Sequence, residues 1–227
     1  MPSREDVFYN GGIYHIYDKT IDDIDIFSSR KIAYEFINVV NYYRSSKVNY
    51  RYSMFKKLDN KSKETKLKKI KLQKYFKVDI LSYCLMPNHY HFLIKQLKEN
   101  GIKTFMANIL NSITRFFNIL NNRKGPVFLT QFKSNEIRHE EQLIYVSRYI
   151  HTNPYAGSIV DEIGEIFNYP FSSITAYMEN HSNDNKINTD LVLNYFKGNK
   201  QRYKNFISKN ADDQKAREWL KYSEKWL

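Results

Sequence analysis

A β-hairpin is encoded by the run Cys84-Leu85-Met86-Pro87-Asn88-His89-Tyr90-His91-Phe92-Leu93-Ile94. Pro87 and Asn88 favour a turn, and the residues on either side of them are mostly apolar, β-branched or aromatic. Strands are therefore predicted over 78–86 and 89–95, joined at this turn.

The second predicted strand begins with a pair of histidines. Successive side chains of a strand point to opposite faces, so His89 and His91 lie side by side and Tyr90 points the other way. Two neighbouring imidazoles can together bind a divalent metal ion. The alternative is that both histidines merely lie at a sheet surface, and the pair alone does not decide between the two.

The rest of the chain supplies further elements with clear periodicity. The apolar spacing predicts a strand over 12–18, helices over 28–43 and 101–121, an extended segment over 127–138 and a helix over 140–152. The last helix is expected to stop before Pro154, because the residue preceding a proline disfavours the helical conformation.

This order of elements predicts the fold class. Strand–helix–strand–strand–helix–strand matches a ferredoxin-like (RRM-like) α+β fold, an antiparallel sheet with helices on one face. Helical patterns return at 189–196 and 219–226, which adds a C-terminal helical segment. The chain is therefore divided into a main domain over 1–180 and a helical appendage over 181–227.

The charge balance favours a polyanionic partner. The chain has 227 residues and a formal net charge of +12 at neutral pH, which favours nucleic acid over a membrane surface. An AT-rich gene can produce the same lysine-rich composition. Residues 56–74 are especially rich in lysine, and a solvated loop or exposed helix is favoured there over a surface for DNA phosphates.

The compartment is also predicted from composition. The single cysteine, Cys84, cannot form a disulfide within the chain, which fits a reducing environment. The N-terminal residues lack the apolar core of a signal peptide, and no later segment resembles a membrane span. A cytoplasmic location is expected.

A second group of polar residues lies on the helix predicted over 140–152. Tyr145, Tyr149 and Asn153 are spaced four apart, so they share one face of that helix. A tyrosine beside an amide on a helix is commonly ordinary packing with a hydrogen bond. The spacing alone therefore leaves packing and function open.

Several spaced motifs together resemble a known family. They are Met86-Pro87-Asn88-His89-Tyr90-His91-Phe92-Leu93-Ile94, Gly125-Pro126-Val127-Phe128, Gln131-Phe132-Lys133-Ser134, Arg148-Tyr149-Ile150-His151-Thr152-Asn153-Pro154-Tyr155-Ala156-Gly157 and Pro170-Phe171-Ser172-Ser173 with Ala176-Tyr177. In this order they resemble the single-tyrosine HUH transposases, in particular REP-associated and related insertion-sequence transposases. The resemblance covers roughly 11–177, and Tyr90 departs from the bulky hydrophobe usual between the two histidines.

The resemblance implies an activity and its residues. It implies a metal-dependent transposase that cleaves and rejoins single-stranded DNA through a 5′-phosphotyrosine intermediate. Tyr149 would be the nucleophile, and His89, His91 and Asn153 would hold the metal ion. Mixed nitrogen and oxygen ligands suit Mg²⁺ or Mn²⁺ in function, although imidazoles also accept other divalent ions.

The resemblance also implies partners. The substrate would be single-stranded DNA with hairpin or repeat ends, and Lys133 and Arg138 are candidates for contacts with its phosphates. A solvated surface is the alternative for both residues. Related transposases include dimers that share active sites and also monomers, so a homodimer and a monomer both stay open.

Two other functions remain as alternatives. One is a catalytically inactive or domesticated protein that binds nucleic acid without cleaving it. The other is a nicking enzyme of the relaxase or replication-initiator type, which uses the same pair of histidines and a tyrosine. The position of the histidines before the tyrosine and the Pro-Phe-Ser-Ser motif favour the transposase.

Overall fold

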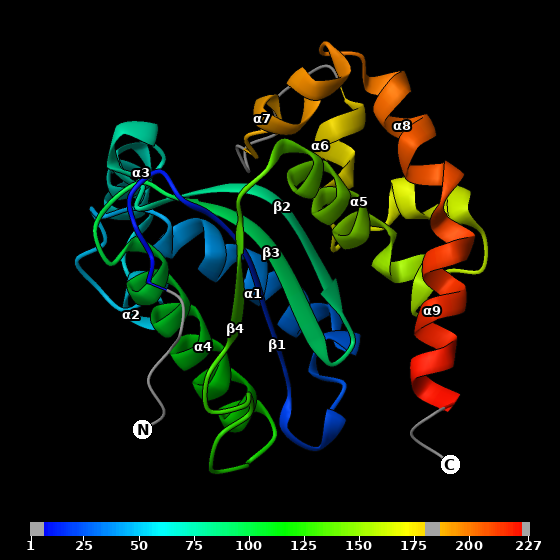
Figure 1. Ribbon diagram of the computed structural model, residues 1–227. Helices are drawn as coiled ribbons and strands as arrows, with labels where there is room; N and C mark the ends of the chain where they lie inside the picture. Colours follow the sequence, from blue (N-terminus) through cyan, green and yellow to red (C-terminus); the bar gives the residue numbers. More distant parts are fainter. Residues whose placement is uncertain (1–6, 180–186, 224–227) are drawn as a thin grey trace.

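A four-stranded antiparallel sheet forms the centre of the molecule (Figure 1). The computed structural model describes residues 7–179 and 187–223. The strands are β1 (Ile13–Lys19), β2 (Val78–Met86), β3 (His89–Gln96) and β4 (Lys133–Ile137), in the spatial order β2-β3-β1-β4. This is the strand order of a ferredoxin-like fold, so the predicted α+β class is confirmed.

The predicted hairpin is present at the expected residues. Met86 pairs with His89, which leaves Pro87 and Asn88 as the two residues of the connecting turn. The register then places His91 opposite Tyr17 of β1, in the interior of the sheet. Of the segment predicted to be extended over 127–138, only β4 is a strand. The residues before it form a loop that joins the sheet through a bridge between Thr20 and Phe128.

Two long helices cover one face of the sheet. They are α1 (Arg30–Tyr43) and α4 (Gly101–Leu120), close to the predicted ranges. Their apolar sides pack on Ile16, Ile80 and Phe92, and Tyr90 is completely buried in the same core. The predicted orientation of Tyr90 away from the two histidines is confirmed.

The lysine-rich segment forms a short exposed helix beside this layer. α2 (Tyr52–Phe55) precedes α3 (Asn60–Ile70), whose start is capped by the Asp59 carboxylate through a hydrogen bond of 2.9 Å from the Ser62 amide. A solvated loop or an exposed helix was the favoured prediction for this segment. The structure confirms the exposed helix, since only Ile70 of α3 is buried.

The opposite face of the sheet is covered by the C-terminal half of the chain (Figure 1). This layer comprises α5 (Glu140–Ala156), α6 (Ile174–Met178), α7 (Asp190–Leu193), α8 (Lys200–Lys209) and α9 (Ala211–Ser223). A second core joins Leu81 and Leu93 of the sheet to Ile150 of α5 and Ile207 of α8. The prediction placed helices on one face. The second layer forms because the sheet residues facing away from α1 and α4 are apolar too.

Short 3₁₀ turns complete the described elements: Ile21–Asp23, Ile26–Ser28, Gln73–Tyr75, Ile163–Asn168 and Asn194–Phe196. Part of the predicted appendage, 181–186 and 224–227, lies outside the described residues. Within the described residues, no helix combines the length and apolar character needed to cross a membrane.

The prediction that the helix from 140 stops before Pro154 is wrong. α5 continues through Pro154 to Ala156. A proline near the end of a helix removes only the hydrogen bond to the carbonyl four residues earlier, here that of Ile150. The last turn still closes, because the Gly157 amide donates to the Asn153 carbonyl at 2.8 Å. Asn153 therefore lies within the helix, one turn after Tyr149.

A buried polar network fixes α5 against the second layer. The two ring nitrogens of His151 contact the Tyr203 hydroxyl at 2.9 Å and the Ser173 hydroxyl at 2.8 Å. The Ser147 hydroxyl lies 2.5 Å from that of Tyr203 and 3.0 Å from that of Ser82 on β2. Since these groups are withdrawn from water, the network fixes the rotation of α5 over the sheet.

Removing the Tyr203 hydroxyl should destabilise the fold. In Tyr203→Phe, the His151 ring nitrogen loses its buried partner, and we expect the free energy of unfolding to fall by about 1–3 kcal/mol. Urea denaturation measures this change. Tyr195→Phe is the matched control, because Tyr195 is 47% exposed and its loss should change stability little. Equal stability of the two variants would contradict the role given to the network.

Burial of His151 also makes stability depend on pH. Burial lowers its pKa from 6.5 to about 3, so between these values the unfolded chain binds the proton and the folded chain does not. Stability is therefore full above about pH 6.5 and falls with acidification, by about 2 kcal/mol at about pH 5 from this residue alone. Urea denaturation at about pH 6.5 and about pH 5 measures this loss of stability, which should be smaller in His151→Gln than in wild type. An unchanged loss would exclude His151 as its source.

Candidate active site

The predicted site residues line one cavity between the hairpin and α5. The cavity has a volume of about 580 Å³, and its wall includes His89, His91, Tyr149 and Asn153. β3 supplies the two histidines and α5 supplies the other two residues. Lys133 also lines this cavity, at the start of β4. Arg138 does not: it lies on an open surface, where it forms an ion pair with Glu136 at 3.1 Å.

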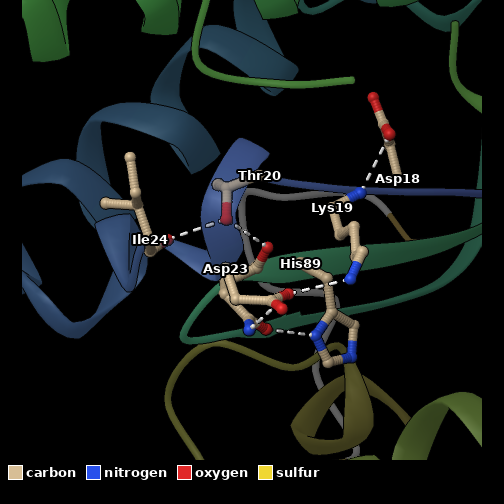
Figure 2. Close-up of polar contacts among 7 residues, drawn as sticks. Asp18, Lys19, Thr20, Asp23, Ile24 and His89 are labelled. Carbon is tan, nitrogen blue, oxygen red and sulfur yellow. Dashed lines mark hydrogen bonds and ion pairs between the residues drawn. The ribbon is translucent and has the colours of Figure 1, made fainter. Parts of the chain in front are cut away.

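His89 is oriented by the turn that precedes it. Its Nδ1 lies 2.7 Å from the Asn88 Oδ1, and the Asn88 amide nitrogen donates to Asp23 at 3.4 Å. Lys19 forms an ion pair with the same Asp23 oxygen at 2.9 Å, as Figure 2 shows. Because an amide oxygen only accepts hydrogen bonds, His89 carries its proton on Nδ1. Its Nε2 therefore keeps a lone pair that is free to bind a metal ion.

His91 is held by His15, a histidine that the sequence patterns did not single out. The Nε2 of His15 on β1 lies 3.0 Å from the Nδ1 of His91. The His15 ring also stacks on Tyr17, with 4.9 Å between ring centroids. Alternation along the predicted strand over 12–18 placed His15 and Tyr17 on one face. The missing information was the pairing of β1 with β3, which brings that face beside His91.

Tyr149 packs against two of these histidines. Its ring meets those of His91 and His15 edge to face, with centroid distances of 5.4 and 5.9 Å. The Asn153 side-chain nitrogen donates to the Tyr149 carbonyl at 2.7 Å, so the Asn153 Oδ1 is the atom left for a ligand. Gln214 of α9 donates to the same carbonyl at 3.2 Å. Arg148 and His151, the neighbours of Tyr149 and Thr152 on α5, do not line this cavity.

Burial keeps the histidines of the site uncharged. Burial lowers the pKa of His89 to about 4, partly offset by Glu218 of α9, which also lines the cavity. It lowers the pKa of His15 to about 4 and that of His91 well below 6.5, with the neighbouring imidazoles adding to the effect at His91. Neutral imidazoles at physiological pH are the form that binds metal ions.

A buried carboxyl group lies at the edge of the same cavity. Burial raises the pKa of Asp18 to about 7, against the opposing effects of the Lys19 amide and Lys133. In Figure 2 its carboxyl points away from His89. Asp18 is therefore not placed to share a metal ion with that histidine.

The donor set fits a divalent metal ion. His89 and His91 each have Nδ1 engaged in a contact, which leaves Nε2 as the ring nitrogen that could bind a ligand. The side-chain nitrogen of Asn153 is likewise engaged, which leaves its Oδ1 as the atom that could bind a ligand. Across 7–179 and 187–223, no three histidines, cysteines or carboxylates converge as a metal cluster. A third ligand from the amide of Asn153 is consistent with that.

Comparisons with known proteins identify the family and the fold. One solved structure, a REP-associated tyrosine transposase bound to a REP hairpin, shares the fold with a TM-score of 0.53 and 12% sequence identity. The match covers 78% of this chain and 86% of that chain. A search of curated proteins gives no match. The family model described as "Transposase IS200 like" matches 31–153, more than half of the chain. The chain therefore belongs to the IS200-like transposase family.

Proposed function

We propose that this protein cleaves and rejoins single-stranded DNA, with Tyr149 forming a covalent 5′-phosphotyrosine bond. The observation that carries the proposal is the convergence of His89, His91, Tyr149 and Asn153 on one cavity. A binding surface alone has no need of two uncharged imidazoles beside a tyrosine and an amide. Family membership supports transposition as the purpose of the reaction.

The two histidines and Asn153 would hold Mg²⁺ or Mn²⁺. The proposed donor atoms are the Nε2 of His89, the Nε2 of His91 and the Oδ1 of Asn153, because the other polar atom of each side chain is already engaged. When bound, such an ion neutralises charge on the scissile phosphate and polarises it toward attack. Three protein ligands leave further coordination positions for phosphate oxygens and water.

Tyr149 supplies the nucleophile in this scheme. Its phenolic oxygen gives up its proton to solvent and forms a bond to the scissile phosphorus while the bond from phosphorus to the 3′-oxygen breaks. The 3′-oxygen takes up a proton from water and leaves as a hydroxyl. The phosphodiester energy is retained in the phosphotyrosine bond. A 3′-hydroxyl of another strand can therefore reverse the step and join new DNA without ATP.

The DNA partner follows from charge and from the related structure. The net charge of +12 favours a phosphate backbone, and Lys19 and Lys133 stand at the wall of the cavity. The similar transposase was solved with a REP hairpin, which supports a hairpin end as the substrate for this chain.

The direct test of the proposed function is to incubate the protein with Mn²⁺ and a labelled DNA hairpin that carries a single-stranded flank. A denaturation-resistant protein–DNA adduct is expected; DNA binding that is indifferent to chelator, without cleavage, would favour a domesticated binding protein.

A single chain should contain a complete active site. All four residues line one cavity. Ser147 bonds α5 to Ser82 of its own sheet, and His151 and Gln214 tie α5 to the other helices of the same layer. Mixing His89→Ala with Tyr149→Phe protein should therefore restore no cleavage. Gel assays of the equimolar mixture measure this. Recovery of a substantial fraction of wild-type activity would show that two subunits share each site, as in a homodimer that exchanges the tyrosine helix.

A further inference from the structure

His15 lies outside the matched family segment and has no role in the scheme above. It is a buried residue, 8% exposed, in the middle of β1. Its ring is packed between Tyr17, His91 and Tyr149, with centroid distances of 4.9, 5.2 and 5.9 Å. The side chain is therefore held in one place beside the proposed metal ligands.

The contact of 3.0 Å between the two ring nitrogens admits two arrangements of protons. If His15 donates, the His91 Nδ1 accepts, and neutral His91 then carries its own proton on Nε2. If His91 donates from Nδ1, its Nε2 keeps a lone pair. Only the second arrangement lets His91 bind a metal ion through Nε2, the ring nitrogen that is not engaged with His15.

His89 already shows the second arrangement. Its Nδ1 donates to an oxygen of Asn88, an atom that can only accept. Histidines that bind metals usually donate their other ring N–H in this way, and the acceptor fixes the tautomer and orientation of the ring. The Asn88 Oδ1 is that acceptor for His89. At His91 the corresponding position is occupied by the Nε2 of His15.

We infer that His15 is a positioning residue that accepts a hydrogen bond from the His91 Nδ1 and thereby presents the His91 Nε2 to a divalent metal ion. The inference rests on the metal site of the proposed function. Stacking on Tyr17 keeps the His15 ring in the plane from which its Nε2 reaches His91. His15 itself would not touch the metal ion.

The first test reads the tautomers without DNA or metal. Long-range ¹H–¹⁵N correlation spectra of the metal-free protein at neutral pH distinguish protonation at Nδ1 from protonation at Nε2. We expect His91 and His15 both to be protonated on Nδ1. A proton on the Nε2 of His91 would overturn the inference, because His15 would then be the donor.

The second test measures Mn²⁺ affinity by calorimetry. His15→Phe keeps an aromatic ring but removes the acceptor, and we expect Mn²⁺ to bind roughly 10- to 100-fold more weakly. His15→Gln offers an amide oxygen as acceptor and should recover part of the loss. His139→Phe is the matched control, because His139 is exposed and lies outside the cavity. This variant should bind Mn²⁺ as tightly as wild type.

The remaining outcomes separate the inference from its alternatives. If His15→Phe binds Mn²⁺ as tightly as wild type, the inference is wrong. If it loses binding as completely as His91→Ala, with no recovery in His15→Gln, His15 is a metal ligand and the inference is wrong as well. If the tautomers and affinities are as expected but no DNA is cleaved, the positioning role stands and the proposed function fails.

Discussion

Tyr149→Phe is expected to abolish the covalent protein–DNA adduct and to reduce strand cleavage by roughly 10⁴-fold or more, the scale seen when an enzyme loses its nucleophile. The phenylalanine ring preserves the edge-to-face contacts with His91 and His15, so the cavity should keep its shape. DNA binding and thermal stability should stay close to wild type. Adduct formation on denaturing gels and binding to a labelled hairpin measure the two effects separately.

The matched control is Tyr145→Phe. Tyr145 lies one turn earlier on α5, is 51% exposed and does not line the cavity. Its loss should leave adduct formation within about twofold of wild type, as expected for an exposed side chain away from the site. An adduct of normal yield in Tyr149→Phe would show that another residue attacks the phosphate, and the assignment would fail.

His89→Ala is expected to have the second-largest effect. It removes one of three proposed ligands, and we expect cleavage in Mn²⁺ to fall by roughly 10²- to 10³-fold, the scale of losing charge stabilisation at a reacting centre. Affinity for hairpin DNA should change little, because phosphate contacts along the backbone dominate such binding. Cleavage rates measured at increasing Mn²⁺ concentration should show the weakened metal binding as a shift of the half-maximal rate to higher concentrations.

His139→Ala serves as the control for this prediction. It removes an exposed histidine outside the cavity and should cleave DNA as wild type does at every Mn²⁺ concentration. Chelation of divalent ions from the wild-type protein should reproduce the defect of His89→Ala. Undiminished cleavage by His89→Ala, or by wild type in chelator, would remove the metal ion from the proposed reaction.

Local patterns predicted most of the sheet and the site. The turn at Pro87 and Asn88 fixes the hairpin register, and strand alternation then requires His89 and His91 to share a face. Helical spacing likewise required Tyr149 and Asn153 to share a face. These periodicities are properties of the backbone, so they can be read without knowing the tertiary structure. The functional roles, in contrast, came from the resemblance to a family.

What the sequence did not reveal depends on contacts between distant segments. His15 meets His91 only because β1 pairs with β3, and Gln214 reaches Tyr149 only because α9 packs on α5. The continuation of α5 through Pro154 is a similar case, since packing of the buried Pro154 and Asn153 outweighs a local preference. Such features follow from the assembled core and leave no periodic signal.

The central claim is most directly tested by identifying the residue that bears the DNA. The wild-type protein would be incubated with a hairpin substrate and Mn²⁺, digested with protease and nuclease, and its peptides analysed by mass spectrometry. We expect a nucleotide linked through its 5′-phosphate to Tyr149 and a free 3′-hydroxyl on the released strand. Attachment to a different residue, or cleavage that leaves a 3′-phosphate, would contradict it.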